Sequence, residues 1–273
     1  PVLIFGIGPF PELGVSGAAA ATVTAQALVS LLFFKAVLRE KVLFPHLRLW
    51  VLVPVKVWRE IVRIGVPSAV QNLIYAGISM ILTRLITGWG DLAVAAQRVG
   101  SQIESVSWMV GDGFSAAVNA FLGQNYGAKR YDRVRRGYFC AIAMTAAWGL
   151  CTTFLLIGMA RPLFSLFLQE EEVMAIGVNY LRIVGLSQMF MMVEQTSIGA
   201  FSGLGRTLYP SIISVTFTSA RIPVAVLLSS VMGLSGIWWA LSISSMVKGC
   251  ILFVSFVVFL YVFLERKKDE KTV

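Results

Sequence analysis

The chain has 273 residues, of which 57% are hydrophobic and only 14% are charged, and its formal net charge is +9. A soluble domain is typically about 45–50% apolar and about 25% charged, so the composition excludes an ordinary soluble domain. It predicts an all-α, polytopic integral membrane protein, because several stretches exceed the ~20 apolar residues that cross a bilayer. The basic residues lie in loops between these stretches, a pattern typical of membrane proteins. Membrane lipids are therefore expected partners, and nucleic acid is not.

The first complete span is expected at about 14–37. Before it, residues 1–7 are apolar but too short to cross a membrane. They are interpreted as the end of a helix whose start is missing, so the chain is expected to be a fragment. The connection 35–63 follows with seven basic residues. Its last part, 55–64, alternates apolar and basic residues at helical spacing, which predicts a short amphipathic helix on the membrane surface.

The next span is expected at about 64–86, where Pro67 starts or kinks the helix. Gln71, Asn72 and Tyr75 begin a polar stripe on this span, and they are candidate residues of a substrate cavity. We expect the cavity to lie inside a helix bundle, because polar groups are costly against lipid.

A stronger polar stripe follows on the span 92–123. It comprises Gln97, Ser101, Glu104, Trp108, Asp112, Ser115 and Asn119. Steps of three or four residues place all of these side chains on one helical face. Ionisable groups on so apolar a span predict a wet cavity or a partner helix. Glu104 and Asp112 are eight residues, or about 12 Å, apart along the helix, too far to share a proton. They fit a cavity wall or helix–helix hydrogen bonds.

Four more spans are expected at about 137–160, 173–204, 208–231 and 234–263, followed by a charged tail. The loop 129–136 carries five basic residues and the tail four, on the same side as 35–63. The opposite loops are more acidic. The positive-inside rule makes the basic side cytoplasmic, so the chain is expected in the plasma (inner) membrane with its C-terminus in the cytoplasm.

The chain contains an internal repeat and no catalytic or metal-binding motif. The sequence LGVSG at 13–17 recurs as MGLSG at 232–236, and parallel repeats are a recurrent transporter architecture. The cysteines show no C-x-x-C spacing and His46 is the only histidine, so no metal site and no cofactor are expected. An intramembrane enzyme would need a metal constellation, a diphosphate motif or a Ser/His pair, and none is visible.

Five segments in the order of the chain resemble the MATE (multidrug and toxic compound extrusion) family of secondary transporters. They are PVLIFGIGPFPELGVSGAAAA at 1–21, RIGVPS at 63–68, LAVAAQ at 92–97, GQNYGA at 123–128 and GAFSGLGRT at 199–207. The resemblance implies a twelve-helix transporter of two six-helix lobes around a central cavity.

By the same resemblance, residues 1–40 would be the end of the first lobe, namely a half span and its last span. Residues 41–63 would be a cytoplasmic linker, 64–263 the second six-helix lobe and 264–273 the cytoplasmic tail. The missing N-terminal lobe of the same protein would be a partner.

The resemblance also implies candidate ion-coupling residues. Many members carry a Glu in the helix that begins GVP, where this chain has Tyr75. Glu194 resembles the acidic position of the tenth helix and is the candidate ion-coupling residue; its alternative role is a structural hydrogen bond. Deep in an apolar span, this carboxylate must find a partner or a proton. Lys248 and Arg221, near the middle of the last two spans, are the candidate charge partners.

The resulting hypothesis is a secondary active efflux transporter that exchanges organic, cationic compounds for H⁺ or Na⁺. A lipid-linked oligosaccharide flippase is the alternative, but it should carry more cationic residues to meet a pyrophosphate. Glu104 and Asp112 favour cationic or neutral cargo instead. A non-transport membrane scaffold would leave the buried ionisable groups unexplained.

Overall fold

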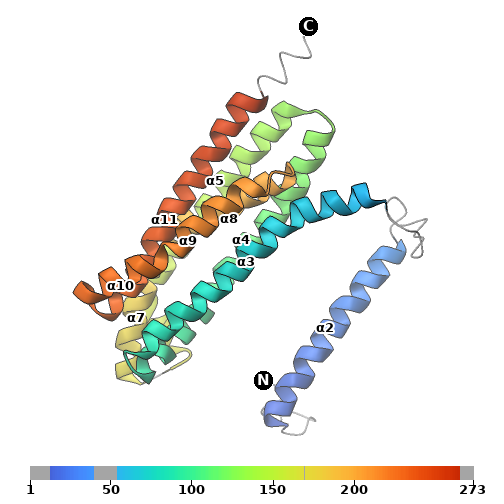
Figure 1. The fold of residues 1–273 in the computed structure, drawn as a ribbon. Helices are drawn as coiled ribbons and strands as arrows, with labels where there is room; N and C mark the ends of the chain where they lie inside the picture. The colour runs from blue at the N-terminus through green and yellow to red at the C-terminus, as the bar shows by residue number, and fades with distance from the viewer. Residues whose placement is uncertain (1–12, 40–53, 169, 265–273) are drawn as a thin grey trace. The chain divides into compact units, whose positions relative to one another are not determined.

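The computed structural model describes residues 13–39, 54–168 and 170–264. All the elements in this part of the chain are helices (Figure 1), which confirms the predicted all-α class. The expected half span 1–7, the loop 40–53 and the tail from 265 lie outside the described residues. The chain divides into two compact units, Pro1–Val55 and Lys56–Val273. Helix α2 (Gly14–Arg39) is the described part of the first unit.

Helix α3 (Val55–Thr87) opens the second unit and differs from the prediction. The expected surface helix 55–64 and the span 64–86 form one continuous helix of 33 residues, with Pro67 inside it. At ~1.5 Å per residue it is about 50 Å long, more than the ~30 Å hydrocarbon core. Its amphipathic start can therefore extend beyond the apolar layer without a break.

Three helices follow the turn at Gly90. They are α4 (Asp91–Gly127), α5 (Tyr131–Gly158) and the short α6 (Ala160–Ser165). Gly90 has φ 98°, in the left-handed region that favours glycine. This turn reverses the chain between α3 and α4.

The expected span 173–204 is not one straight helix. It consists of α7 (Glu171–Gly185) and α8 (Gln188–Gly203), which meet at an angle of 50°. The backbone N–H and the hydroxyl of Ser187 both donate to the Val184 carbonyl, at 3.0 and 2.8 Å. These bonds satisfy a carbonyl of the last turn of α7, where the regular helix ends.

The next span is also interrupted. Helices α9 (Leu208–Ser219) and α10 (Arg221–Met232) are separated at Ala220. Pro223 lacks the N–H that would bond the Ser219 carbonyl, and its ring crowds that carbonyl, which accounts for the interruption. Helix α11 (Leu234–Phe259) ends the bundle and continues as a π-helical turn, Leu260–Leu264.

Five described helices or helix pairs are long and apolar enough to cross a membrane, and the bent pair α7–α8 makes a sixth. The five are α2, α3, α5, the segment Leu208–Met232 and the segment Leu234–Val262. The sequence predicted a seventh complete span at 92–123, but α4 does not meet this criterion. Its polar stripe lowers its hydropathy although it has 37 residues.

Helix α8 occupies the centre of the second unit and packs against α4, α5 and α11. Aromatic and aliphatic side chains of these four helices, such as Leu122, Tyr138 and Phe256, form one buried cluster with Phe201. A second cluster joins α3 to α4, α10 and α11. Between these packed regions the helices leave a polar cavity.

Candidate functional site

A cavity of about 600 Å³ opens within the second unit, between α3, α4, α7, α8, the α9–α10 pair and α11. The residues that the sequence singled out come from five of these segments and all line this cavity. They are Gln71, Asn72, Tyr75, Glu104, Asp112, Glu194, Arg221 and Lys248. The structure therefore brings together groups that are up to 177 positions apart, from 71 to 248.

The polar stripe of α4 divides between the cavity and the helix packing. Its first five members, from Gln97 to Asp112, line the cavity. Ser115 and Asn119 instead meet α8, where Gly199 and Gly203 allow close approach. A Cβ at either glycine would collide with the carbonyl of Ser115 or Asn119. One face of α4 thus builds a wall of the cavity at one end and a tight helix contact at the other.

Glu104 is buried at the cavity wall and is held by neutral groups. It accepts hydrogen bonds from Trp108 Nε1 at 3.0 Å, the Tyr180 hydroxyl at 3.1 Å and Gln188 Nε2 at 2.9 Å. These donors come from α4, α7 and α8. Glu104 forms no ion pair with a described residue. Three N–H and O–H donors compensate part of the desolvation of the carboxylate.

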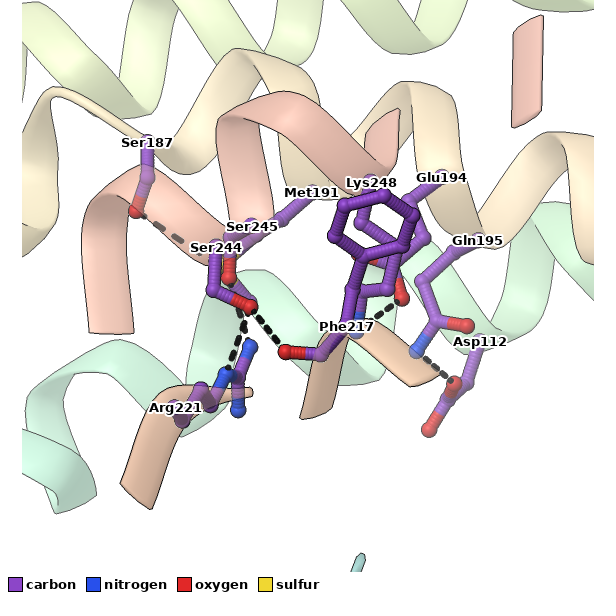
Figure 2. Close-up of polar contacts among 10 residues, drawn as sticks. All are labelled: Asp112, Ser187, Met191, Glu194, Gln195, Phe217, Arg221, Ser244, Ser245 and Lys248. Atoms are coloured by element: carbon purple, nitrogen blue, oxygen red, sulfur yellow. Dashed lines mark hydrogen bonds and ion pairs between the residues drawn. The ribbon is translucent and has the colours of Figure 1, made fainter. Parts of the chain in front are cut away.

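Glu194 is also buried, but it is held by a charge. Its Oε1 lies 2.7 Å from Lys248 Nζ, and the two side chains are only 11% and 5% exposed. Helices α8 and α11 carry the two groups (Figure 2). Removing either partner would leave the other charge buried and unpaired, which is costly.

Asp112 is the exposed carboxylate of the cavity. Its Oδ1 accepts a hydrogen bond from Gln195 Nε2 at 3.1 Å, across the α4–α8 contact (Figure 2). Because the side chain is exposed, water and solutes in the cavity can reach it. This group therefore differs from both buried carboxylates.

Arg221, the second candidate charge partner, does not pair with a carboxylate of the described residues. Its Nε donates to Ser244 Oγ at 3.1 Å and its Nη2 to Ser245 Oγ at 2.8 Å (Figure 2). The side chain lies at the start of α10 and is 7% exposed. The guanidinium thus borders the cavity with neutral partners only.

Helix α3 lines one side of the cavity with Gln71, Asn72 and Tyr75. The Tyr75 ring lies 6.2 Å from the Trp108 ring, at an interplanar angle of 54°. This aromatic pair joins α3 to α4 beside Glu104. Amide groups and aromatic faces of this kind suit an organic ligand, which needs apolar contact and a few polar anchors.

Comparisons with known proteins identify the fold and the family. The MatE family model matches residues 67–227. The chain belongs to the MatE family. A probable multidrug resistance protein NorM of Thermotoga maritima is 31% identical over 250 residues, which cover 86% of this chain and 51% of that protein. A protein of Shewanella oneidensis named FAD transporter is 26% identical and is matched over 91% of this chain and 55% of its own length.

Solved structures show the same fold. A MOP-superfamily transporter from Pyrococcus furiosus matches with a TM-score of 0.83 at 21% identity, over 97% of this chain and 59% of that chain. The chain spans about half the length of the curated relatives it matches. The MatE assignment confirms the predicted family, which is one of transporters and not of enzymes. It also confirms the prediction of an integral membrane protein.

Several residues that line this MatE cavity, or hold the charged groups in its wall, were not predicted from the sequence. Tyr180, Gln188 and Gln195 donate to the carboxylates, and Ser244 and Ser245 accept from Arg221. One pattern could have found Tyr180 and Gln195, although not Gln188. The cavity-lining positions along α7 and α8 follow one another mainly at steps of three or four: 180, 184, 187, 191, 194, 195 and 198. This second stripe is masked by the apolar residues within it.

The described residues contain no group of three or more His, Cys, Asp or Glu side chains that could hold a metal ion. The carboxylates of the cavity are distributed over α4 and α8 with separate partners. What the arrangement offers is one exposed carboxylate, one shielded carboxylate, one ion pair and one guanidinium without a counter-ion.

Proposed function

We propose that this chain forms the second lobe, and the end of the first lobe, of a secondary active efflux transporter. It would export organic, cationic compounds in exchange for H⁺ or Na⁺, together with an N-terminal lobe of the same protein. The observation that carries the proposal is the buried Glu194–Lys248 ion pair in the wall of the cavity. The family assignment supports transport, while the names of its relatives, multidrug resistance and FAD, leave the cargo open.

The ion pair can act as an exchange device. Glu194 can bind one positive charge at a time: the ammonium of Lys248, a coupling ion, or a cationic cargo. Coupling ion and cargo therefore exclude one another, which is the requirement for exchange. When neither is bound, Lys248 compensates the carboxylate and the empty cavity carries no isolated buried charge at this position.

The same geometry favours H⁺ over Na⁺ as the coupling ion. A proton needs only one lone pair of the Glu194 carboxylate. A sodium ion also needs room and further oxygen ligands beside a carboxylate that the ammonium already contacts at 2.7 Å. Protonation of Glu194 would remove its attraction to Lys248, which is one of several contacts between α8 and α11.

The orientation follows from the basic loops and is part of the proposal. We expect the start of α5 and the C-terminus in the cytoplasm, in the plasma membrane, with lipids around the outer faces of the helices. In a cysteine-free background, Arg133→Cys should resist an impermeant maleimide in intact cells and Glu171→Cys should react. Labelling at 133 but not at 171 would reverse the orientation.

The test of function uses the complete transporter in liposomes with an imposed pH or Na⁺ gradient. Glu194→Gln should abolish gradient-driven uptake of an organic cation. Because this change leaves Lys248 unpaired, the double variant Glu194→Gln/Lys248→Gln serves as the control for folding. It should unfold near the wild-type temperature and also fail to couple. Wild-type uptake with unchanged ion dependence in either variant would remove the coupling role from Glu194.

The alternative flippase function lacks a specific observation in its favour. A pyrophosphate carries at least two negative charges, and the described residues that line the cavity offer one cation that is not paired with a carboxylate, Arg221. Asp112 lies exposed in the same cavity and would repel such a group. The cavity is therefore better suited to organic cations.

A further inference from the structure

We propose that Arg221 forms an oxyanion subsite in the cavity, which binds a carboxylate or phosphate group carried by the cargo itself. The preferred cargo is then an organic cation that also bears an acidic group. This inference rests on the proposed transport function and specifies its substrate class.

The first argument comes from the charges that line the cavity. Each carboxylate of the lining already has partners: Glu194 has Lys248, Glu104 has three neutral donors, and Asp112 has Gln195. Arg221 has no carboxylate partner among the described residues. It is left as the one cavity-lining cation there without a counter-ion.

The second argument comes from burial. Arg221 is 7% exposed and its contacts are two serine hydroxyls. Removing a charged group from water has an effective penalty of several kcal/mol, and neutral acceptors offset only part of it. An oxyanion that arrives with the cargo would supply the missing compensation.

The third argument comes from the geometry of the donors. A guanidinium has five N–H groups, and the serines take one from Nε and one from Nη2. Three remain, two on Nη1 and one on Nη2. One N–H of each Nη nitrogen forms the fork that binds carboxylate or phosphate in a bidentate manner. The serines therefore fix the guanidinium from the side and leave its recognition edge for a ligand.

Hydroxyl groups extend this site along the cavity wall. The Ser244 hydroxyl donates to the Phe217 carbonyl at 2.8 Å, so it accepts from Arg221 with its lone pairs. Ser245 also accepts from Arg221, and its own proton remains available to an anion. One and two helical turns before Arg221, Thr218 and Ser214 line the same cavity. The Ser214 hydroxyl is buried without a partner.

The test compares two dyes that differ only in the acidic group. Tetramethylrhodamine carries a cation and a free carboxylate, and its methyl ester carries the cation alone. Binding to the complete transporter is measured by fluorescence polarisation in phosphatidylcholine nanodiscs. Wild type should bind the acid more tightly than the ester. Arg221→Gln should weaken acid binding about tenfold, because one charged hydrogen-bonded contact is worth roughly that factor, and leave ester binding unchanged.

Two further variants make the result specific. Arg182→Gln removes a cation that is exposed and outside the cavity, and it should bind both dyes as wild type does. Arg221→Lys keeps the charge but lacks the fork, and it should lose a part of the preference for the acid. If Arg221→Gln is not folded, this selective loss in Arg221→Lys decides the question, and its absence overturns the proposal.

Other outcomes contradict the proposal in distinguishable ways. Equal affinity of wild type for the acid and the ester would mean that the Arg221 guanidinium is hydrated by water and does not bind the carboxylate of the dye. Equal weakening of both dyes in Arg221→Gln would point to a carboxylate elsewhere in the protein as its partner. Displacement of the acid by phosphatidylglycerol from wild type but not from Arg221→Gln would assign the site to a lipid headgroup. The proposed function fails separately, if neither dye is transported although both bind.

Discussion

The two buried carboxylates of the cavity are stabilised in different ways. Glu104 on α4 is surrounded by Trp108, Tyr180 and Gln188, all neutral donors. Glu194 on α8 faces a single ammonium, Lys248, at 2.7 Å. Both residues are more than nine-tenths buried, at 6% and 8% exposure. The surroundings, rather than burial, therefore distinguish them.

The difference indicates different tasks. Three donors from three helices keep Glu104 in place whatever occupies the cavity, so it acts as a fixed link between α4, α7 and α8. A single ion pair is stable while both charges are present and is lost when either is neutralised. In the proposed function, Glu194 is therefore the group whose state changes during exchange, and the following predictions test this contrast.

The largest loss of stability, measured as the free energy of unfolding, is expected from Lys248→Met. It leaves the Glu194 charge buried without its partner, and breaking a buried pair in this way typically costs about 3–5 kcal/mol. The double variant Lys248→Met/Glu194→Gln should recover most of that loss. Unfolding of the complete protein in detergent measures both values, with Lys56→Met on the exposed start of α3 as the control. A cost below about 1 kcal/mol would contradict the role of the pair.

Gly203→Ala should cause the next largest loss of stability, because the positions of the two carboxylates depend on close packing of α4 and α8. The added Cβ would meet the Asn119 carbonyl at 2.5 Å, and such overpacking costs about 1–3 kcal/mol. Gly113→Ala on α4 is the matched control, since its Cβ would meet nothing within 4 Å. The same unfolding experiment should show the Gly113 variant unchanged or slightly more stable. Equal effects at both positions would mean that close approach is unimportant.

Tyr180→Phe should have a smaller effect. It removes one of the three donors to Glu104, for which about 1–2 kcal/mol is expected, and the remaining two keep the carboxylate in place. Tyr209→Phe, at an exposed tyrosine on α9, is the control. If Tyr180→Phe destabilised the protein as much as Lys248→Met, the distinction between a shared and a single partner would be wrong.

The sequence predicted the positions on each helix better than the contacts between helices. Steps of three or four residues identified the face of α4 that carries Glu104 and Asp112. They could not show that Ser115 and Asn119, on the same face, meet the glycines of α8. A period assigns a side chain to a face, but the neighbouring helix decides whether that face meets a cavity or another backbone.

The sequence also could not predict which charged side chains pair with one another. Lys248 and Arg221 both lie in the middle of apolar spans, and each was a candidate partner for Glu194. Their positions in the chain do not fix which of them α11 or α10 presents to α8. The two helix breaks were not predicted. Pro223 could have indicated the break at Ala220, whereas the bend between α7 and α8 occurs without a proline.

Asp112→Asn should have the smallest effect on stability and the clearest effect on cargo. Its carboxylate is exposed and has one neutral partner, Gln195. Substitutions at such positions usually change stability by less than about 0.5 kcal/mol. A cation in the cavity would nevertheless lose one charged contact. Exposed charge pairs are worth roughly 0.2–1 kcal/mol, so the half-saturating concentration of an organic cation should rise about 1.4- to fivefold.

The matched control is Asp91→Asn, at the exposed first turn of α4 and outside the cavity. It removes the same charge from the same helix and should leave transport unchanged. Glu104→Gln provides the opposite contrast, because a buried carboxylate with three donors should affect stability before it affects cargo. If Asp112→Asn and Asp91→Asn gave the same half-saturating concentration, Asp112 would not contact the cargo. Attraction of organic cations would then have to come from elsewhere in the cavity.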